Sequence, residues 1–423
     1  MAQRIDRAAS FGQNLYVDTR GAAGEPVPFT QAVINGLAQG GGLYVPEELP
    51  TLSLDEICAL ARLPYAQRAA AIYKAFNVDL PDEAIDELMG RAYGDNFDDE
   101  AICPITSLDE STHILELWHG PTSAFKDMAL QCLPHFFSAS AEKLRKEGTL
   151  DHEFMILVAT SGDTGKAALV GFQDVPGVSI CVFYPFGGVS QVQRAQMVTQ
   201  EGENVHVCAV EGNFDDAQTG VKNIFAACQG KALPFLLSSA NSINIGRLAP
   251  QIMYYFKSYA DLLSRKVISL GDKVDFSVPT GNFGDILAGY LAKKLGLPVG
   301  RLICASNANN VLTDFLTTGV YDRRRPLLKT TSPSMDILVS SNLERLLYHV
   351  TGSDAEVAGF MQQLAATGSY TVRPETLAAI QQTFSCGWSS EDEVAGEIRA
   401  RYEKDGYLCD THTAVAFHVA AQK

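Results

Sequence analysis

The sequence predicts an α/β protein built on parallel sheets, and three observations lead to this prediction. Short apolar runs alternate with longer amphipathic stretches from about residue 113 onward. Polar, glycine-rich turns follow two of the apolar runs. The chain has 423 residues, of which 46% are hydrophobic, so it can bury a large core divided among two or three domains.

The strands are expected where short runs are rich in β-branched or aromatic side chains. These runs cover residues 154–160, 178–185, 205–212, 274–281 and 301–307. Stretches with helical spacing separate them, at 190–200, 216–228 and 248–263. Strands that alternate with helices indicate βαβ units, and such units give a parallel sheet covered by helices on both faces.

The two ends of the chain differ from this pattern. The first hundred residues contain more helix and loop, so residues 1–100 are expected to form a separate, mainly helical N-terminal domain. The region from about 340 to 405 is mainly helical and acidic, and we expect it to be an appendage of the remaining region, 101–423.

Composition and charge exclude several classes of function. The net charge is −16 and the densest basic cluster is only Arg323–Arg325, so nucleic-acid binding is not expected. Nine scattered cysteines without a CxxC pair favour reduced thiols and a cytoplasmic location. No secretory signal and no apolar run of membrane-spanning length are found, so no membrane association is expected.

Two glycine-rich turns join a predicted strand to a predicted helix. The first is SGDTG at 161–165 and the second is GNFGD at 281–285. In open parallel sheets, ligands bind beyond the carboxyl ends of the strands. Backbone N–H groups in such turns, together with the helix dipole, form a site for phosphate or carboxylate. A nucleoside-triphosphate P-loop is not indicated, because the GxxxxGK[ST] spacing is absent.

A lysine stands at a third junction, in the segment HGPTSAFKDMALQ. Lys126 lies between a plausible strand end and a plausible helix start, a position suited to an amine that reacts. Pyridoxal 5′-phosphate would require all three features: an amine, a loop for its phosphate, and a loop for a substrate carboxylate.

Ten ordered segments resemble the threonine synthases, which belong to the tryptophan-synthase-β-like (fold type II) pyridoxal-phosphate enzymes. They include YVDTRG, HGPTSAFKDMALQ, ATSGDTGKAA, ANSINIGRLAPQ, PTGNFGD, SPSMDILVSSNLERLLY and DTHTAVA. The resemblance implies two parallel-sheet α/β domains with the cofactor between them, plus the N-terminal mainly helical domain. It assigns 101–423 to the catalytic region that binds pyridoxal 5′-phosphate.

The resemblance also implies which residues hold the cofactor. Lys126 would form the Schiff base and then act as the proton shuttle. Thr413 would form a hydrogen bond with the pyridine nitrogen. The cofactor phosphate would be held by the second glycine-rich turn, made of Gly281, Asn282, Phe283, Gly284 and Asp285.

A separate set of residues is implied for the substrate. Ser161 and Thr164 belong to the loop that would face the substrate carboxylate. Asn241, Ser242 and Arg247 match the motif that would hold the substrate phosphate, where a planar guanidinium binds phosphate bidentately.

Two aspartates have less certain roles. Many members of the wider fold type have Asn where this chain has Asp163, and an ionised Asp cannot donate to the cofactor's ring oxygen. Asp163 is therefore either protonated or placed elsewhere. Asp127 either sets the environment of Lys126 or caps the helix that follows it, and we favour the cap.

The implied reaction converts O-phospho-L-homoserine and water to L-threonine and phosphate. The alternative is a serine or threonine dehydratase of the same fold, which would leave the segment NSINIGR and the long N-terminal region unexplained. The family also implies a monomer or a weak homodimer.

Overall fold

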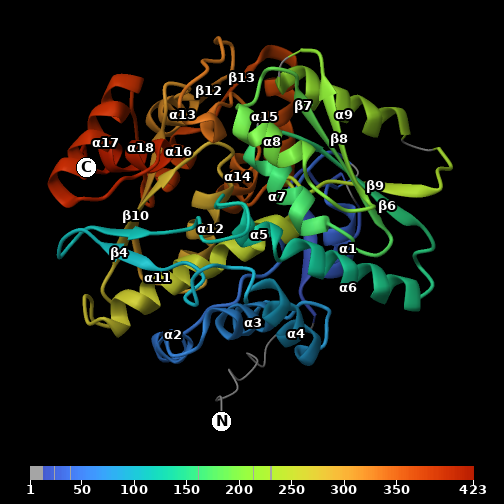
Figure 1. The fold of residues 1–423 in the computed structure, drawn as a ribbon, viewed down its shortest axis with the longest axis horizontal. Coiled ribbons are helices and arrows are strands. Elements are labelled where there is room, and N and C mark those ends of the chain that lie inside the picture. The colour runs from blue at the N-terminus through green and yellow to red at the C-terminus, as the bar shows by residue number, and fades with distance from the viewer. Residues whose placement is uncertain (1–12, 23, 39, 161, 213, 229–230) are drawn as a thin grey trace.

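A computed structural model of the chain describes residues 13–22, 24–38, 40–160, 162–212, 214–228 and 231–423. Two parallel sheets form its frame. In Figure 1 the first sheet lies on the right and the elements of the second lie on the left. The short helix α5 (Asp127–Leu130), which directly follows Lys126, lies between them. The predicted α/β class with two parallel sheets is confirmed.

The first sheet has the strand order β8-β7-β6-β9, and every pair in it is parallel. Side chains of β6 and β7 such as Ile156, Ile180 and Val182 are fully buried, because α7 and α9 pack against these strands. Its elements are α6 (Leu133–Lys146), β6 (Glu153–Ala159), α7 (Asp163–Phe172), β7 (Val178–Pro185), α8 (Gln191–Val198), β8 (Val205–Val210), α9 (Phe214–Cys228) and β9 (Phe235–Ser238).

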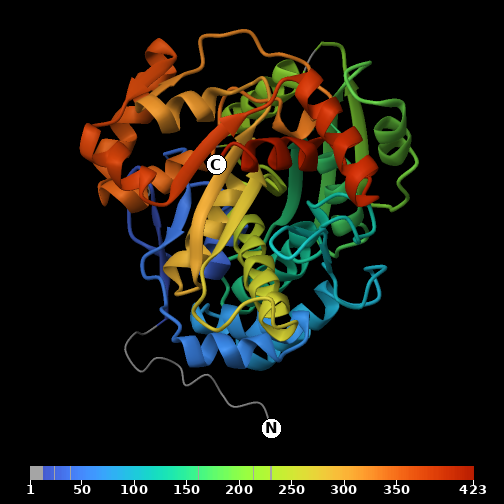
Figure 2. The ribbon, with the colours of Figure 1, turned by 90° about the vertical axis from the view of Figure 1, so that its left-hand side faces the viewer.

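The second sheet has the order β10-β11-β14, again parallel, and its strands run side by side in Figure 2. Strand β14 lies within the stretch expected to be a helical appendage, 340–405, so that stretch also completes the sheet. Neither β9 nor β14 was predicted. The elements are α12 (Gly284–Lys294), β10 (Val274–Pro279), β11 (Val299–Ser306), α13 (Val311–Thr318), β14 (Phe384–Trp388) and α18 (Thr411–Ala420).

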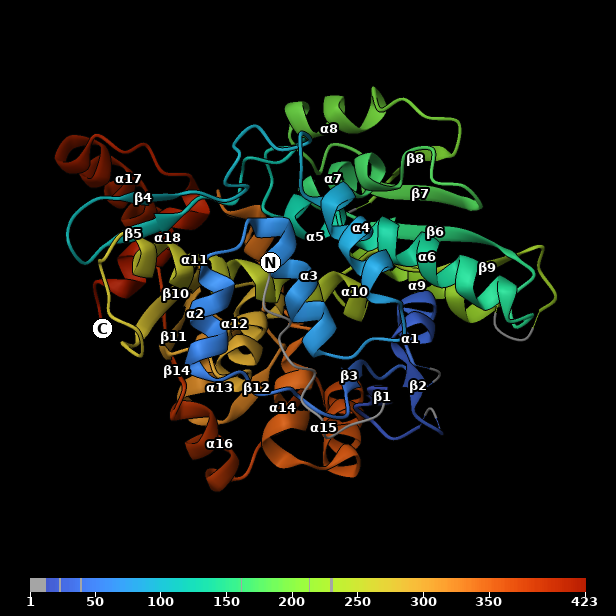
Figure 3. The ribbon, with the colours of Figure 1, turned by 90° about the horizontal axis from the view of Figure 1, so that it is seen from below.

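The N-terminal region combines a small antiparallel sheet, β2-β1-β3, with four helices. Figure 1 shows α2, α3 and α4 along the lower edge, and Figure 3 shows them from below, in front of the centre. One hydrophobic cluster runs continuously from Tyr16 to Phe384. The elements are β1 (Leu15–Asp18), β2 (Val27–Pro28), α1 (Phe29–Asn35), β3 (Tyr44–Pro46), α2 (Leu54–Ala61), α3 (Tyr65–Ala75) and α4 (Asp82–Ala92).

Shorter elements connect these parts. Across the described residues, no helix combines the length and the apolar character needed to cross a membrane. The connecting elements are β4 (Ile105–Ser107), β5 (His113–Leu115), α10 (Ile245–Leu248), η1 (Ala249–Gln251), α11 (Ile252–Ser264), β12 (Val320–Asp322), η2 (Pro333–Met335), α14 (Leu343–Thr351), α15 (Asp354–Thr367), β13 (Ser369–Thr371), α16 (Pro374–Gln381) and α17 (Glu391–Asp405).

Candidate active site

Lys126 immediately precedes α5 and its side chain is buried. The preceding loop is held by Asp127, whose carboxylate accepts hydrogen bonds from the Thr122 backbone N–H and hydroxyl, both at 2.8 Å. Gly120 is needed there, because a Cβ at this position would lie 2.4 Å from the Asp127 Cβ. The expected helix cap by Asp127 is therefore wrong: its carboxylate is committed to Thr122, and α5 has no side-chain cap.

The amine of Lys126 meets an acid from the first glycine-rich turn. Its Nζ donates to Asp163 Oδ2 at 2.6 Å and to Ser334 Oγ at 3.4 Å. The Ser334 hydroxyl in turn donates to Asp163 Oδ2 at 2.9 Å. Asp163 is the first residue of α7, so the helix dipole also favours its negative charge.

Electrostatics fix the charge state of this pair. Burial lowers the pKa of Lys126, the carboxylate of Asp163 opposes that shift, and the charge of Arg247 adds to it. Burial by itself would raise the pKa of Asp163, but Lys126 and Ser334 outweigh it, and the pKa falls below its usual value. Of the two alternatives for Asp163, the geometry therefore favours an ionised carboxylate paired with the lysine.

The second glycine-rich turn leads from β10 into α12. A Cβ on Gly281 would lie 2.8 Å from the Ser334 carbonyl oxygen, so only glycine fits this approach. Phe283 adopts a left-handed conformation with φ of 65°, and its ring is fully buried. The turn ends at the N-terminus of α12, a position that suits an anion because the helix dipole is positive there.

The carboxylate of Asp285 is held by side chains of α11. Its Oδ1 accepts hydrogen bonds from the hydroxyls of Tyr254 at 2.6 Å and Tyr255 at 2.8 Å, both on α11. Burial raises the pKa of Asp285 above its usual value, against the effect of the two tyrosines. Asp285 was predicted to hold the cofactor phosphate, and from this position only its backbone could do so.

The residues implied for the substrate phosphate lie around α10. Arg247 is 4% exposed; its Nη1 donates to the Ala240 carbonyl at 2.8 Å, while its Nε is buried without a partner among the described residues. Burial lowers its pKa to about 10, so the guanidinium stays charged at neutral pH. Ser242 and Asn241 precede it on the same loop, and the Ser242 hydroxyl receives a bond from Asn282 Nδ2 at 2.8 Å. The two predicted phosphate sites are therefore joined.

The remaining predicted residues take varied positions. Ser161 lies outside the described residues. The backbone N–H of Thr164 donates to Asp163 at 2.9 Å. Thr413 lies in the first turn of α18, where its hydroxyl donates to Asp410 at 2.5 Å, so a bond to a pyridine nitrogen would have to replace that contact.

Comparison with known proteins identifies the chain. The family described as "Threonine synthase N terminus" matches residues 15–93, and the family "Pyridoxal-phosphate dependent enzyme" matches residues 108–387. Threonine synthase from Pseudomonas aeruginosa is 40% identical over 412 residues, which cover 96% of this chain and 84% of that protein. The chain belongs to the threonine synthase family of pyridoxal-phosphate-dependent enzymes.

Solved structures agree with this membership. The chain resembles pyridoxal-phosphate-bound threonine synthase from Brucella melitensis with a TM-score of 0.89 and 41% identity, covering 97% of this chain and 86% of that one. Yeast threonine synthase gives a TM-score of 0.88 and 35% identity, covering 96% and 83%. The predicted family and the fold type II architecture are thus confirmed.

Animal relatives add a difference in length. Threonine synthase-like 1 of Homo sapiens is 42% identical over 407 residues, which cover 93% of this chain and 54% of that protein. The chain therefore spans about half the length of these relatives.

The site suits the cofactor of the threonine synthase family. Gly281 leaves a cradle that a Cβ would fill, and the turn ends at the N-terminus of α12, which favours a phosphate. Lys126 offers a buried amine whose pKa is lowered by burial, as an amine that attacks an aldehyde requires. These residues fit pyridoxal 5′-phosphate.

Two functional neighbours of Lys126 were missed in the sequence. Ser334 bonds both Lys126 and Asp163, and its backbone N–H donates to His412 Nε2 at 3.3 Å. Both residues, Ser334 and His412, lie in segments that carry the resemblance to threonine synthases, but neither was assigned a role. The sequence pattern identified the segments that contain these residues but not their contacts, because Ser334 lies 208 residues from Lys126 in the chain.

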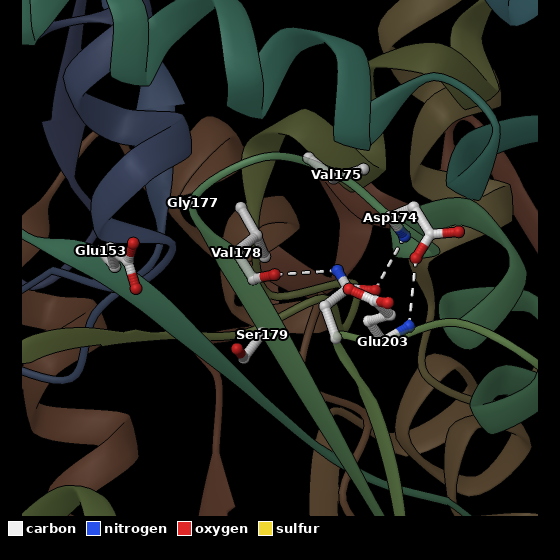
Figure 4. A pocket seen from close by; sticks show the side chains of 8 residues that line it. Glu153, Asp174, Val175, Gly177, Val178, Ser179 and Glu203 are labelled. Carbon is white, nitrogen blue, oxygen red and sulfur yellow. Dashed lines mark hydrogen bonds between the residues drawn. The ribbon is translucent and has the colours of Figure 1, made fainter.

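A surface hollow of this threonine synthase relative lies away from the site, where β6 and β7 begin (Figure 4). Several of its polar groups form hydrogen bonds with one another. Asp174 Oδ1 accepts from the Glu203 N–H at 3.1 Å, and Asn204 donates to the Val178 carbonyl at 2.8 Å. These bonds join the turn before β7, and the start of β7, to the segment just before β8, so these polar groups have a structural role.

Proposed function

We propose that this chain is a threonine synthase that converts O-phospho-L-homoserine and water to L-threonine and phosphate. One observation carries the proposal: Arg247 is buried and charged, and its Nε–H has no partner among the described residues. Its charge also lies close enough to Lys126 to lower the lysine pKa. Burying such a cation costs free energy unless an anion joins it. A phosphate group on the substrate would supply that anion to Arg247.

The buried cation also disfavours a serine or threonine dehydratase. Those substrates carry no phosphate, so Arg247 Nε would stay buried and unpaired throughout turnover. The homologous N-terminal region, residues 15–93, further supports a threonine synthase over a dehydratase.

Lys126 would handle the protons. Pyridoxal 5′-phosphate, when bound, supplies the electron sink that makes the substrate's α-proton and then its β-proton acidic. The reaction needs proton transfers at the α-, β- and γ-carbons of the substrate, and one amine on a short turn can serve more than one of them. Asp163, 2.6 Å from Nζ, would keep this amine protonated between transfers and hold it in place.

Arg247 would stabilise the departing phosphate. Negative charge grows on the phosphate as its bond to the γ-carbon breaks, and a fixed guanidinium in a buried site lowers the free energy of that charge. Asn241 and Ser242 would supply further donors from the same loop. The γ-carbon must then gain a proton to become the methyl group of threonine, water adds at the β-carbon, and L-threonine leaves the site.

We further propose that the enzyme acts in the cytoplasm as a monomer or weak homodimer and binds neither nucleic acid nor membrane. Its net charge of −16 supports the first exclusion. The boundary near residue 100 between an N-terminal domain and the catalytic region is part of the same proposal.

The test is an assay of both products in one tube. The purified protein should be yellow with pyridoxal 5′-phosphate, and borohydride should fix the cofactor to Lys126. Phosphate and threonine should then appear in equal amounts from O-phospho-L-homoserine. Lys126→Ala should abolish both products. Lys166→Ala, which removes a lysine of α7 that donates to Gln200, should retain them.

Other products would point elsewhere. Ammonia and a keto acid from serine or threonine, with no phosphate released from O-phospho-L-homoserine, would replace the proposal with the dehydratase.

A further inference from the structure

The Ser242 hydroxyl is surrounded in an unusual way. Two side-chain amides donate to its oxygen: Asn282 Nδ2 at 2.8 Å and Asn342 Nδ2 at 3.1 Å. A hydroxyl oxygen accepts two hydrogen bonds and donates one. Both acceptor positions are therefore filled, and the hydroxyl hydrogen of Ser242 has no acceptor among the described residues.

Obligate donors fix the direction of both amides. The Oδ1 of Asn282 accepts from the Gly284 backbone N–H at 2.9 Å. The Oδ1 of Asn342 accepts from Arg345 Nη1 at 2.5 Å. A backbone N–H and a guanidinium can only donate, so each amide must present its oxygen to them and its NH₂ group to Ser242.

Arg345 joins this network to the surrounding backbone. It is fully buried, and its other bonds reach the carbonyl oxygens of Tyr44 at 2.9 Å, Ser242 at 3.1 Å and Ile243 at 2.7 Å. None of these partners is a carboxylate, and burial lowers its pKa to about 9, although Glu344 opposes the shift. A charged residue is expensive in such a place, and a neutral acceptor-donor group could not enforce the same direction.

We infer that Asn342 and Arg345 are positioning residues that set the Ser242 hydroxyl as a one-way hydrogen-bond donor for a phosphate oxygen of the substrate. The inference deepens the proposed function and rests on it. Arg345 also binds the two carbonyls of the loop that carries Ser242, so it sets the position of the loop as well as the direction of the bond.

The direction of this bond bears on selectivity among anions. An ionised phosphate has acceptors only, so a hydroxyl with no remaining acceptor position suits it. A ligand group that must donate at this point would find no acceptor. The network therefore favours a fully ionised phosphate over a protonated or neutral group.

The test is a double-mutant cycle on the enzyme loaded with pyridoxal 5′-phosphate. Binding of inorganic phosphate is measured by calorimetry for wild type, Asn342→Ala, Ser242→Ala and the double variant. Asn342→Ala should weaken phosphate binding about tenfold, as expected for one lost bond to a charged group. In the Ser242→Ala background the same change should matter less than about twofold. KM for O-phospho-L-homoserine should rise by a similar factor while kcat stays within about threefold.

Asn14→Ala is the matched control. Asn14 is also a buried amide bonded on both sides, to the Glu48 carbonyl and N–H, but it lies in the N-terminal region. Equal weakening by Asn342→Ala in both backgrounds, or weakening no larger than for Asn14→Ala, would overturn the inference. If Asn342→Ala does not fold, Asn342→Asp serves in the same cycle. Its charge repels phosphate in both backgrounds, whereas its loss of the amide donor acts only where Ser242 is present, so the difference between the backgrounds tests the inference. If the wild-type enzyme shows no turnover, the proposed function is wrong, but calorimetry of phosphate binding still tests the roles of Asn342 and Ser242.

Discussion

The two glycine-rich turns follow the same local plan, yet the structure uses them in opposite ways. Each joins a parallel strand to a helix, and each carries an aspartate in the first turn of that helix, Asp163 on α7 and Asp285 on α12. Asp285 is drawn away by two tyrosines and its pKa is raised by burial. Asp163 faces inward, pairs with Lys126, and its pKa is lowered.

The direction of one carboxylate therefore decides which turn can receive an anion. At α12 the carboxylate of Asp285 is bonded to the two tyrosines of α11, so the helix N-terminus can receive a phosphate. At α7 an ionised carboxylate already occupies the helix N-terminus and a cation is held beside it. The same motif thus serves an anionic ligand in one place and a reactive amine in the other.

The largest expected effect tests whether the α7 turn needs help to bind phosphate. Since Asp163 is ionised, the substrate phosphate should depend on Arg247. Arg247→Ala should lower kcat/KM for O-phospho-L-homoserine by about 10³-fold, while affinity for pyridoxal 5′-phosphate is unchanged. Steady-state kinetics and cofactor titration measure the two quantities. If kcat/KM changed less than tenfold, Arg247 would not be the group on which the substrate phosphate depends, and the role given to it beside the α7 turn would be wrong.

The next effect tests the α12 turn. In Gly281→Ala, the new Cβ would lie 2.8 Å from a backbone oxygen that has little room to move, so the turn must shift. Affinity for pyridoxal 5′-phosphate should fall about 10- to 100-fold, as overpacking of this size implies. In Gly165→Ala the Cβ would lie 2.6 Å from Thr160 Cγ2 and 2.8 Å from the Met197 sulfur, so the α7 turn must also shift, but cofactor affinity should change less because this turn is not the one assigned to the cofactor phosphate. Equal losses of cofactor affinity in the two variants would mean that the α12 turn is not the one that binds the cofactor phosphate.

A smaller effect should appear in the reactivity of Lys126. Asp163 raises the lysine pKa against the effect of burial, so Asp163→Asn should lower that pKa further. The unprotonated amine then exists at lower pH. The rate at which cofactor-free protein recaptures pyridoxal 5′-phosphate, measured against pH, should shift downward by the same amount. Asp285→Asn is the control, and a matching shift there would show that the shift is not due to the ion pair.

The smallest effect concerns stability. The pKa of Asp285 is raised in the folded protein, so the stability it contributes is present at low pH and is lost as pH rises through that folded pKa. Asp285→Asn keeps an oxygen for the two tyrosines but removes the titration. The decline in unfolding free energy that begins as pH rises above the pKa of an unfolded aspartate should therefore become smaller, as measured by urea denaturation at a series of pH values.

Asp163 should behave in the opposite sense. Its pKa is lowered in the folded protein, so the stability it contributes is present above the unfolded pKa and lost as pH falls through the folded one. In cofactor-free protein, Asp163→Asn should therefore reduce the loss of stability toward acid. The same sign for both variants would contradict the opposite roles assigned to the two turns.

The sequence predicted those features that depend on neighbouring residues. The apolar runs around Ile156 and Cys304 predicted strands β6 and β11, since consecutive residues there share one buried environment. Lys126 was found because its position at a strand–helix junction is visible locally. Strands β9 and β14 were missed, because each has only four or five residues and neither stands out from its surroundings.

Features that depend on contacts between distant residues could not be predicted. The direction of the Asp163 carboxylate follows from its approach to Lys126, 37 residues earlier, and to Ser334, 171 residues later. Asn342 reaches Ser242 across 100 residues. Composition and spacing do not encode which of several polar groups a side chain meets after folding, and the expected cap by Asp127 was wrong for the same reason.

The bonds between the two ends of the chain have a consequence for the order of biosynthesis. Thr19 and Arg20 both bind Glu344, the first of them across 325 residues, and Tyr44 accepts from Arg345 across 301. At about 5–20 residues per second, a ribosome needs roughly 15–65 s to produce the partner of Thr19. The N-terminal segment must wait on the ribosome for that time with its buried surface uncovered, so chaperones that shield nascent chains would have their longest task at the opening residues of this protein.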